Sequence, residues 1–147
     1  MAYNVMEIAN ELVKLAAENG GGDLLTNMKL QKLLYYEQGF HLAYFNTPLF
    51  AESIEAWQYG PVVPQVYEHY KPSGRAGLEP TPSDFKFGNK IEKALFDEVY
   101  RVYSAYSAIG LMEMTHAETP WRTTNVGVGN IISHDKMKVF FRKRLKK

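Results

Sequence analysis

The chain has 147 residues, a length typical of a single domain that can bury its own core, and it lacks cysteine, which excludes disulfides, cysteine-ligated zinc and thiol nucleophiles. Its net charge of +1 gives no overall attraction to nucleic acid, although five of the last six residues, 142–147, are basic. It contains no apolar run long enough to span a membrane and no basic, signal-like N-terminus, so we expect a cytoplasmic protein with no membrane contact.

The first third of the chain predicts two helices. Apolar residues recur with the 3.6-residue period of a helix over 5–18, where Asn4 can cap the start and the glycines at 20–22 can end it. A second helix is expected from its cap, Thr26, to about residue 46. Its leucines and aromatic residues form one broad face, so the polar side chains on the other face are expected in solvent.

The middle of the chain predicts little regular structure. Residues 53–59 alternate weakly between polar and apolar and indicate a short strand, whose partner would come from 131–132 or from the segment around Leu78. A short helix is expected over 61–70, because a proline is tolerated in the first turn of a helix. The prolines and glycines of 71–88 indicate a long irregular loop.

The last third predicts three more helices. One covers 89–103, the next is capped by Ser104 or Ser107 and ended by Pro120, and the last is capped by Ser133. The residues expected in the core from these helices are Ile91, Leu95, Phe96, Val99, Val102, Tyr103, Ile109, Leu111, Met112, Thr115, Met137, Phe140 and Phe141.

These elements predict a mainly α fold: one compact domain over residues 1–147, with five to six helices and at most a small β element of two or three strands. A search for catalytic patterns finds nothing complete. The run His116-Ala117-Glu118 matches half of a zinc deaminase signature, but the other half needs two cysteines. The four histidines fall in four different elements. We therefore expect no catalytic residue, no metal and no cofactor.

Two corners rich in aromatic residues and proline interrupt the helical pattern, WQYGPVVP over 57–64 and THAETPW over 115–121. In the first, Gly60 permits a positive φ and Pro61 fixes the following φ, so Trp57 and Tyr59 are held in a fixed relation. We favour a core-forming corner, and the alternative is a rigid aromatic platform for a protein partner.

Several polar and aromatic side chains leave two interpretations open. Neighbouring tyrosines at 35 and 36 differ by about 100° around a helix, so one should be buried and the other should lie at the rim or in an interface. Glu37 and His41 can pair across one turn. His116 either caps its helix, which we favour, or presents a polar group to a partner. The candidate partner-binding residues are Lys29, Gln31, Lys32, Tyr36, Trp57 and Tyr59. The candidate structural residues are Gly60, Pro61, Pro64, Thr115, His116, Pro120 and Trp121.

Three motifs, KLQKLLYY, AWxYGPVVPxVY and THxExPW, occur in this order over 26–121. Together they resemble the Panacea domain, the family of phage-associated GepA-like proteins and SocA-like antitoxins. The resemblance implies an antitoxin, often carried by phages or prophages, that neutralises a co-encoded toxin by direct binding and is not an enzyme. In the SocA-like branch it implies delivery of the toxin to a cytoplasmic protease. The alternatives are a nucleic-acid-binding regulator that uses the basic tail, for which no helix-turn-helix pattern exists, and an unrecognised enzyme.

Overall fold

The computed structural model of the protein describes residues 2–19 and 25–145. These ranges contain seven α-helices, one short 3-10 helix and a two-stranded sheet, which confirms the expected mainly α domain. The glycines predicted to end the first helix lie outside the described residues. The elements are α1 (Val5–Asn19), α2 (Asn27–Phe45), β1 (Glu55–Trp57), β2 (Gly60–Val62), α3 (Pro64–Tyr70), η1 (Lys71–Ser73), α4 (Lys90–Tyr103), α5 (Ala108–Ala117), α6 (Thr119–Arg122) and α7 (His134–Arg142).

The helix starts follow the capping residues found in the sequence. Thr26, Asn89, Ser107 and Ser133 each accept a hydrogen bond from the backbone N–H three residues further on. α2 ends at Phe45, and its C-cap Asn46 has a left-handed φ of 64°. Thr26 and Ser133 confirm the predicted caps, and Ser107, not Ser104, is the cap of α5. Asn89, predicted as the first residue of its helix, is the cap of α4, and Asn46 confirms the predicted end of the second helix.

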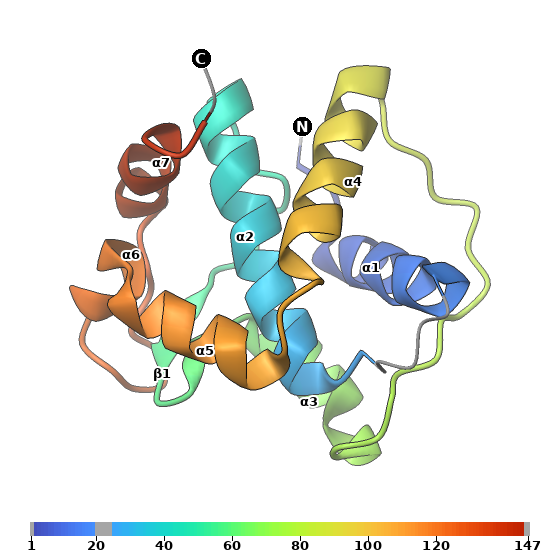
Figure 1. Cartoon of the computed structure of the whole chain (residues 1–147), viewed down its shortest axis with the longest axis horizontal. Helices are drawn as coiled ribbons and strands as arrows, with labels where there is room; N and C mark the ends of the chain where they lie inside the picture. The colour runs from blue at the N-terminus through green and yellow to red at the C-terminus, as the bar shows by residue number, and fades with distance from the viewer. Residues whose placement is uncertain (1, 20–24, 146–147) are drawn as a thin grey trace.

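α2 is the central helix of the fold. Figure 1 shows it between α1 and α4 on one side and α5 and α7 on the other. The hairpin of β1 and β2 packs against its N-terminal half. Every residue of α2 over 29–43 is buried, so the expected solvent-facing side of this helix does not exist. A helix covered on all sides must bury its polar residues as well, and each then needs a partner.

α7 packs closely on α2 because Gly39 has no side chain. An added Cβ at Gly39 would lie 2.2 Å from the ring of Phe141. That ring is fully buried, with its centroid 4.8 Å from the ring of Phe40 and 5.4 Å from the ring of Tyr35. The contact between Gly39 and Phe141 therefore fixes the position of the last helix.

The predicted connections around the sheet need three corrections. β1 pairs with β2 in a tight antiparallel hairpin, with Ala56 opposite Pro61, so Pro61 lies in a strand and not in a helix. α3 begins instead at Pro64, where a proline needs no N–H partner. Pro120 likewise lies in the first turn of α6, after α5 has already ended. The expected partner over 131–132 does contribute, through a single bridge to Glu55 on the other edge of β1.

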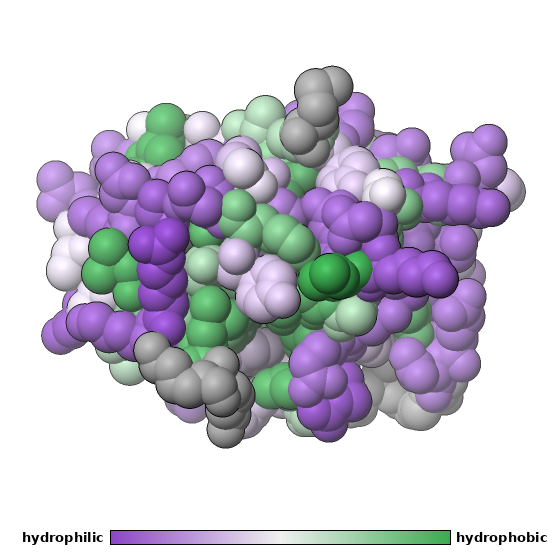
Figure 2. Space-filling model, turned by 90° about the horizontal axis from the view of Figure 1, so that it is seen from above, coloured by the Kyte–Doolittle hydropathy of each residue, from purple (hydrophilic) through white to green (hydrophobic). Residues whose placement is uncertain are grey.

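Three apolar residues expected in the core are exposed. Ile91, Val102 and Ile109 have exposed fractions of 58%, 37% and 61%. α4 and α5 are surface helices, and α4 buries only the narrow stripe of Phe96, Val99 and Tyr103. Seen from above, hydrophobic residues form small separate areas among hydrophilic ones (Figure 2). Of the helices described, none has both the length and the apolar character needed to cross a bilayer.

Candidate partner-binding site

The hairpin carries the exposed aromatic residue of the first corner. Trp57 pairs with Gly60 across the strands, and the two-residue loop between them exposes Tyr59 to 59%. The half-buried Trp57 ring donates from Nε1 to Glu55 Oε1 at 2.9 Å and meets the ring of Tyr67 edge to face at 5.1 Å between centroids. Both contacts fix the ring, so this corner is a preorganised aromatic surface.

The side chain of Lys32 passes directly beneath the hairpin. Gly60 has the predicted positive φ, +115°, and a Cβ there would lie 2.5 Å from Lys32 Cε and 3.1 Å from Thr115 Oγ1. Lys32 is only 1% exposed, and its Nζ lies 3.5 Å from the carbonyl oxygen of Pro61. Burial lowers the pKa of Lys32 to about 8. One residue from each of the three sequence motifs thus meets at this point.

A second junction between the motifs is built around Glu118. Its Oε1 accepts a hydrogen bond from Tyr35 Oη at 2.9 Å, and its Oε2 accepts one from Tyr36 Oη at 2.9 Å. Arg144 Nη1 lies 3.1 Å from the same Oε2. Burial raises the pKa of Glu118, while the hydrogen bond from Tyr36 and the charge of Arg144 oppose the rise.

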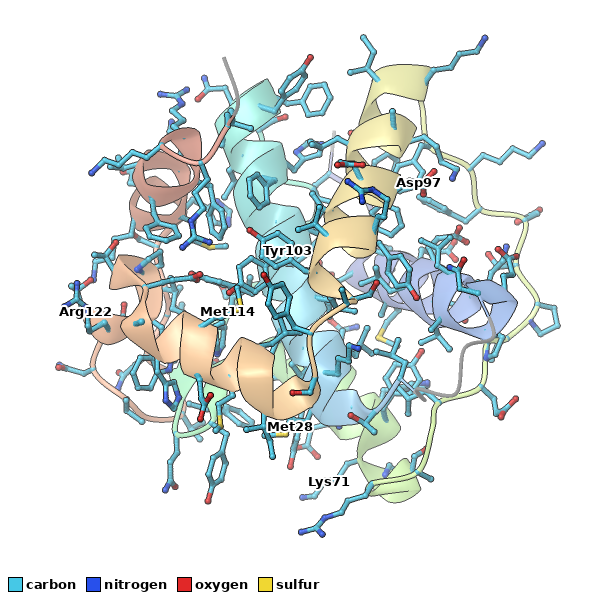
Figure 3. All side chains as sticks on the ribbon, viewed as in Figure 1. Met28, Lys71, Asp97, Tyr103, Met114 and Arg122 are labelled. Atoms are coloured by element: carbon cyan, nitrogen blue, oxygen red, sulfur yellow. The ribbon has the colours of Figure 1, made fainter. Side chains whose placement is uncertain are left out.

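The Glu118 network corrects the interpretation of the tyrosine pair. Tyr35 and Tyr36 are both fully buried, because α2 is covered on both of the sides that they face. Tyr36 also stacks on Tyr103, with centroids 4.0 Å apart and ring planes 12° apart, and Figure 3 shows Tyr103 between α2 and α4. Tyr36 therefore offers no exposed surface to a partner. Glu118 lies inside the third motif, so the motif already marked this residue, although its role was not recognised.

The two other polar candidates on α2 are also buried, which contradicts the expectation that they face solvent. Lys29 Nζ donates to the carbonyl oxygen of Ser104 at 2.7 Å. Gln31 Oε1 accepts from the backbone N–H of Val63 at 2.9 Å and so holds the chain just after the hairpin. These side chains connect the central helix to its neighbours.

The third motif attaches the second corner to the first. Trp121 is half-buried and donates from Nε1 to the carbonyl oxygen of Trp57 at 2.8 Å. His116 stacks on the Trp121 ring, with centroids 4.0 Å apart and planes 21° apart. Pro120 is buried, and Thr115 donates from Oγ1 to the carbonyl oxygen of Met112 at 2.8 Å. The two corners, more than fifty residues apart in the chain, thus form one assembly.

The expected pair of Glu37 and His41 does not form. His41 Nε2 lies 2.7 Å from Glu92 Oε2 on α4, and its Nδ1 lies 2.6 Å from the carbonyl oxygen of Thr47. Glu37 is 2% exposed, and burial together with the charge of Asp97 raises its pKa well above the usual range. Figure 3 labels Asp97 on α4.

The described part of the basic tail is not a simple solvated end. Arg144 pairs with Glu118 and lies 4.6 Å above the ring centroid of Phe140. Arg142 Nη2 donates to Asn46 Oδ1 at 3.2 Å. Two of the basic residues proposed for nucleic acid are therefore engaged within the domain.

A groove of about 690 Å³ opens between α2, the hairpin and the turn after α3. Its apolar wall includes Met28, Trp57 and Tyr59, and its cations are Lys32, Lys71 and Arg75. None of the described residues that line it is acidic. Figure 3 labels Met28 and Lys71 at this end of the molecule. Lys71 and Arg75 come from the irregular loop, so the sequence alone gave no reason to group them with Lys32. Over the described residues, no three His, Asp or Glu side chains are arranged to hold a metal ion.

Comparison with known proteins points to one family. The family model "Antitoxin SocA-like, Panacea domain" matches residues 30–122, more than half of the chain. The chain is 30% identical over 141 residues to Antitoxin SocA of Caulobacter vibrioides, a match that covers 80% of this chain and 72% of that protein. No solved structure matches. The matched segment contains the hairpin, Lys32 and Glu118, and the chain therefore belongs to the SocA-like antitoxins of the Panacea domain family.

Proposed function

We propose that this protein neutralises a co-encoded toxin in the cytoplasm by direct protein–protein binding, through the groove beside the hairpin. Membership of an antitoxin family implies a toxin as partner and indicates a role without catalysis. The observation that supports this location is the groove itself, which combines fixed aromatic side chains with cations at one end of the domain. Aromatic residues and arginine dominate the binding energy of protein interfaces.

The buried candidates constrain where the partner can bind. Tyr36 is fully buried against Glu118, Lys29 holds the carbonyl oxygen of Ser104, and Gln31 holds the chain just after the hairpin, so these buried side chains offer a partner little surface. Tyr59 is the candidate with a large exposed area. Since Trp57 below it is fixed by two contacts, a partner would lose little side-chain entropy on binding there.

A growth assay tests this function. Expressing the protein encoded beside this chain should arrest growth, and co-expressing the wild-type chain should restore it. Tyr59→Ala should weaken the rescue, whereas Tyr106→Ala, a change at another exposed tyrosine (45%) on the loop before α5, should not. Full toxicity of every neighbouring gene product, in the presence of soluble wild-type chain, would contradict the proposal.

Two mechanisms of neutralisation predict different fates for the toxin. If the chain blocks the toxin by occupying its active surface, purified chain alone should inhibit purified toxin, and the toxin should persist in the cell. If the chain delivers the toxin to a cytoplasmic protease, the half-life of the toxin should fall on co-expression and recover in a protease-deficient strain. Measuring the half-life by a translation chase in both strains separates the two.

A further inference from the structure

We infer that the groove binds an acidic segment of the partner protein, in which an Asp or Glu carboxylate lies against Lys32 and Arg75 and a neighbouring apolar side chain packs on Trp57 and Met28. This inference rests on the proposed function and adds the chemistry of the segment that the groove accepts.

The first observation is a buried cation at the groove. Lys32 lines the groove and is 1% exposed. Its Nζ makes one long contact, 3.5 Å to the carbonyl oxygen of Pro61, and within the described residues it forms no ion pair with a carboxylate. Burying a charge without a counter-charge is costly. A carboxylate from outside would remove this cost.

The second observation is the charge of the groove. Lys71 and Arg75 are exposed and line it together with Lys32, and among residues 2–19 and 25–145 no acidic side chain does. Residues 1–141 as a whole do not share this excess: five of the 17 basic residues lie in 142–147, which leaves 12, including the three of the groove, against 16 acidic residues. The groove is thus a local basic site on a slightly acidic body, and charge complementarity favours an acidic ligand.

The third observation is the apolar wall. Trp57 and Tyr67 meet edge to face, and Met28 lies beside them in the groove. Methionine adapts its shape to the side chain it meets, and fixed aromatic rings provide large contact areas. The ligand should therefore combine a carboxylate with a large apolar side chain. Single-stranded nucleic acid could also stack on such rings, and the experiment below distinguishes it.

Isothermal titration of the purified toxin into wild-type and variant chains tests the inference. Lys32→Met keeps the length of the side chain but removes the charge, and Arg75→Glu reverses a charge at the surface. Each should weaken binding by about tenfold or more, whereas the matched control Arg122→Glu, at an exposed arginine on α6, should change it by less than about twofold. Wild-type affinity should also fall above about pH 8, where Lys32 loses its proton, and Lys32→Met should lack this fall.

Variants that bind the toxin as tightly as wild type would overturn this inference while leaving the proposed function intact. Arg75→Glu keeps the test decisive even if Lys32→Met fails to fold, because Arg75 is exposed.

An array of random decapeptides provides a probe that does not depend on the toxin. Peptides retained by the wild-type chain should be enriched in Asp or Glu beside Leu, Phe or Trp, and Arg75→Glu should abolish the enrichment. Lack of enrichment, or retention of oligothymidine that Arg75→Glu abolishes, would also overturn the inference. If the array shows the enrichment but no neighbouring gene product is toxic, the proposed function fails and the specificity of the groove stands.

Discussion

Replacing Gly39 by alanine tests the packing that positions α7. In an exposed helix interior this change is stabilising by about 0.5–1 kcal/mol, because glycine loses more backbone entropy on folding. Here the new Cβ would lie 2.2 Å from the ring of Phe141. The ring cannot move away freely, since it is fully buried against Phe40, Tyr35 and Tyr36.

The two contributions have opposite signs, and the clash is the larger. Overpacking a core costs about 1–3 kcal/mol. After the gain in helix propensity is subtracted, the free energy of unfolding should fall by up to about 2.5 kcal/mol, with a central value of about 1 kcal/mol. For a protein of this size the melting temperature should fall by about 2–4 °C for each kcal/mol.

Urea unfolding of the wild-type protein and four variants tests this packing argument. The control is Gly110→Ala, another helical glycine, where a Cβ would meet only Ser107 Oγ at 3.1 Å and Tyr106 Cβ at 3.9 Å; it should be neutral or stabilising. Phe141→Leu removes the ring atoms that clash, so the double variant with Gly39→Ala should be more stable than the sum of the single effects by about 1 kcal/mol or more. A stabilised Gly39→Ala, or strict additivity, would refute the packing argument.

Three further predictions concern stability. Trp121→Ala should lower the free energy of unfolding by about 3 kcal/mol, because it removes the stack on His116 and the hydrogen bond that joins the two corners; a loss below about 1 kcal/mol would contradict this. The free energy of unfolding of the wild type should fall as the pH rises above 4.5, the usual pKa of a glutamate, because folded Glu37 keeps a proton that the unfolded chain releases. Glu37→Gln should flatten this fall in urea titrations between about pH 5 and 8. An unchanged slope would exclude Glu37 as its source. Arg144→Ala should cost about 1 kcal/mol through its partly exposed pair with Glu118, whereas Lys143→Ala should be neutral by thermal melting; equal effects would exclude the pair.

The sequence predicted those parts of the fold that depend on local chemistry. The capping residues Thr26, Asn89, Ser107 and Ser133 act through their own backbone neighbours. Thr26 and Ser133 were predicted as caps, Ser107 was one of two candidates, and Asn89 was predicted one residue off, as the first residue of its helix. Gly60 has the positive φ that was expected from its place in the corner. The order of three motifs identified the family, which the comparisons confirm.

The errors concern positions whose environment is set by distant segments. Lys29, Gln31 and Lys32 were expected in solvent because they are polar, but the outer side of α2 is covered by the hairpin, α4 and α5. The local spacing of polar and apolar residues in α2 does not reveal that other segments cover this side of the helix. The groove combines Lys32 with Arg75, and the network at Glu118 combines α2 with the C-terminal segment, so both depend on tertiary packing that a single sequence does not encode locally.

Site-specific photo-crosslinking tests the central claim, binding of the toxin at the hairpin groove, most directly. A photoreactive phenylalanine analogue is placed at Tyr59, on the hairpin loop, and in a separate protein at the similarly exposed Tyr106. Both proteins should retain the ability to restore growth, which shows that each still binds the toxin. If the toxin binds at the hairpin groove, irradiation of the complexes should give a covalent product with the toxin from position 59 and none from position 106. A covalent product from position 106 and none from position 59 would contradict binding at the groove.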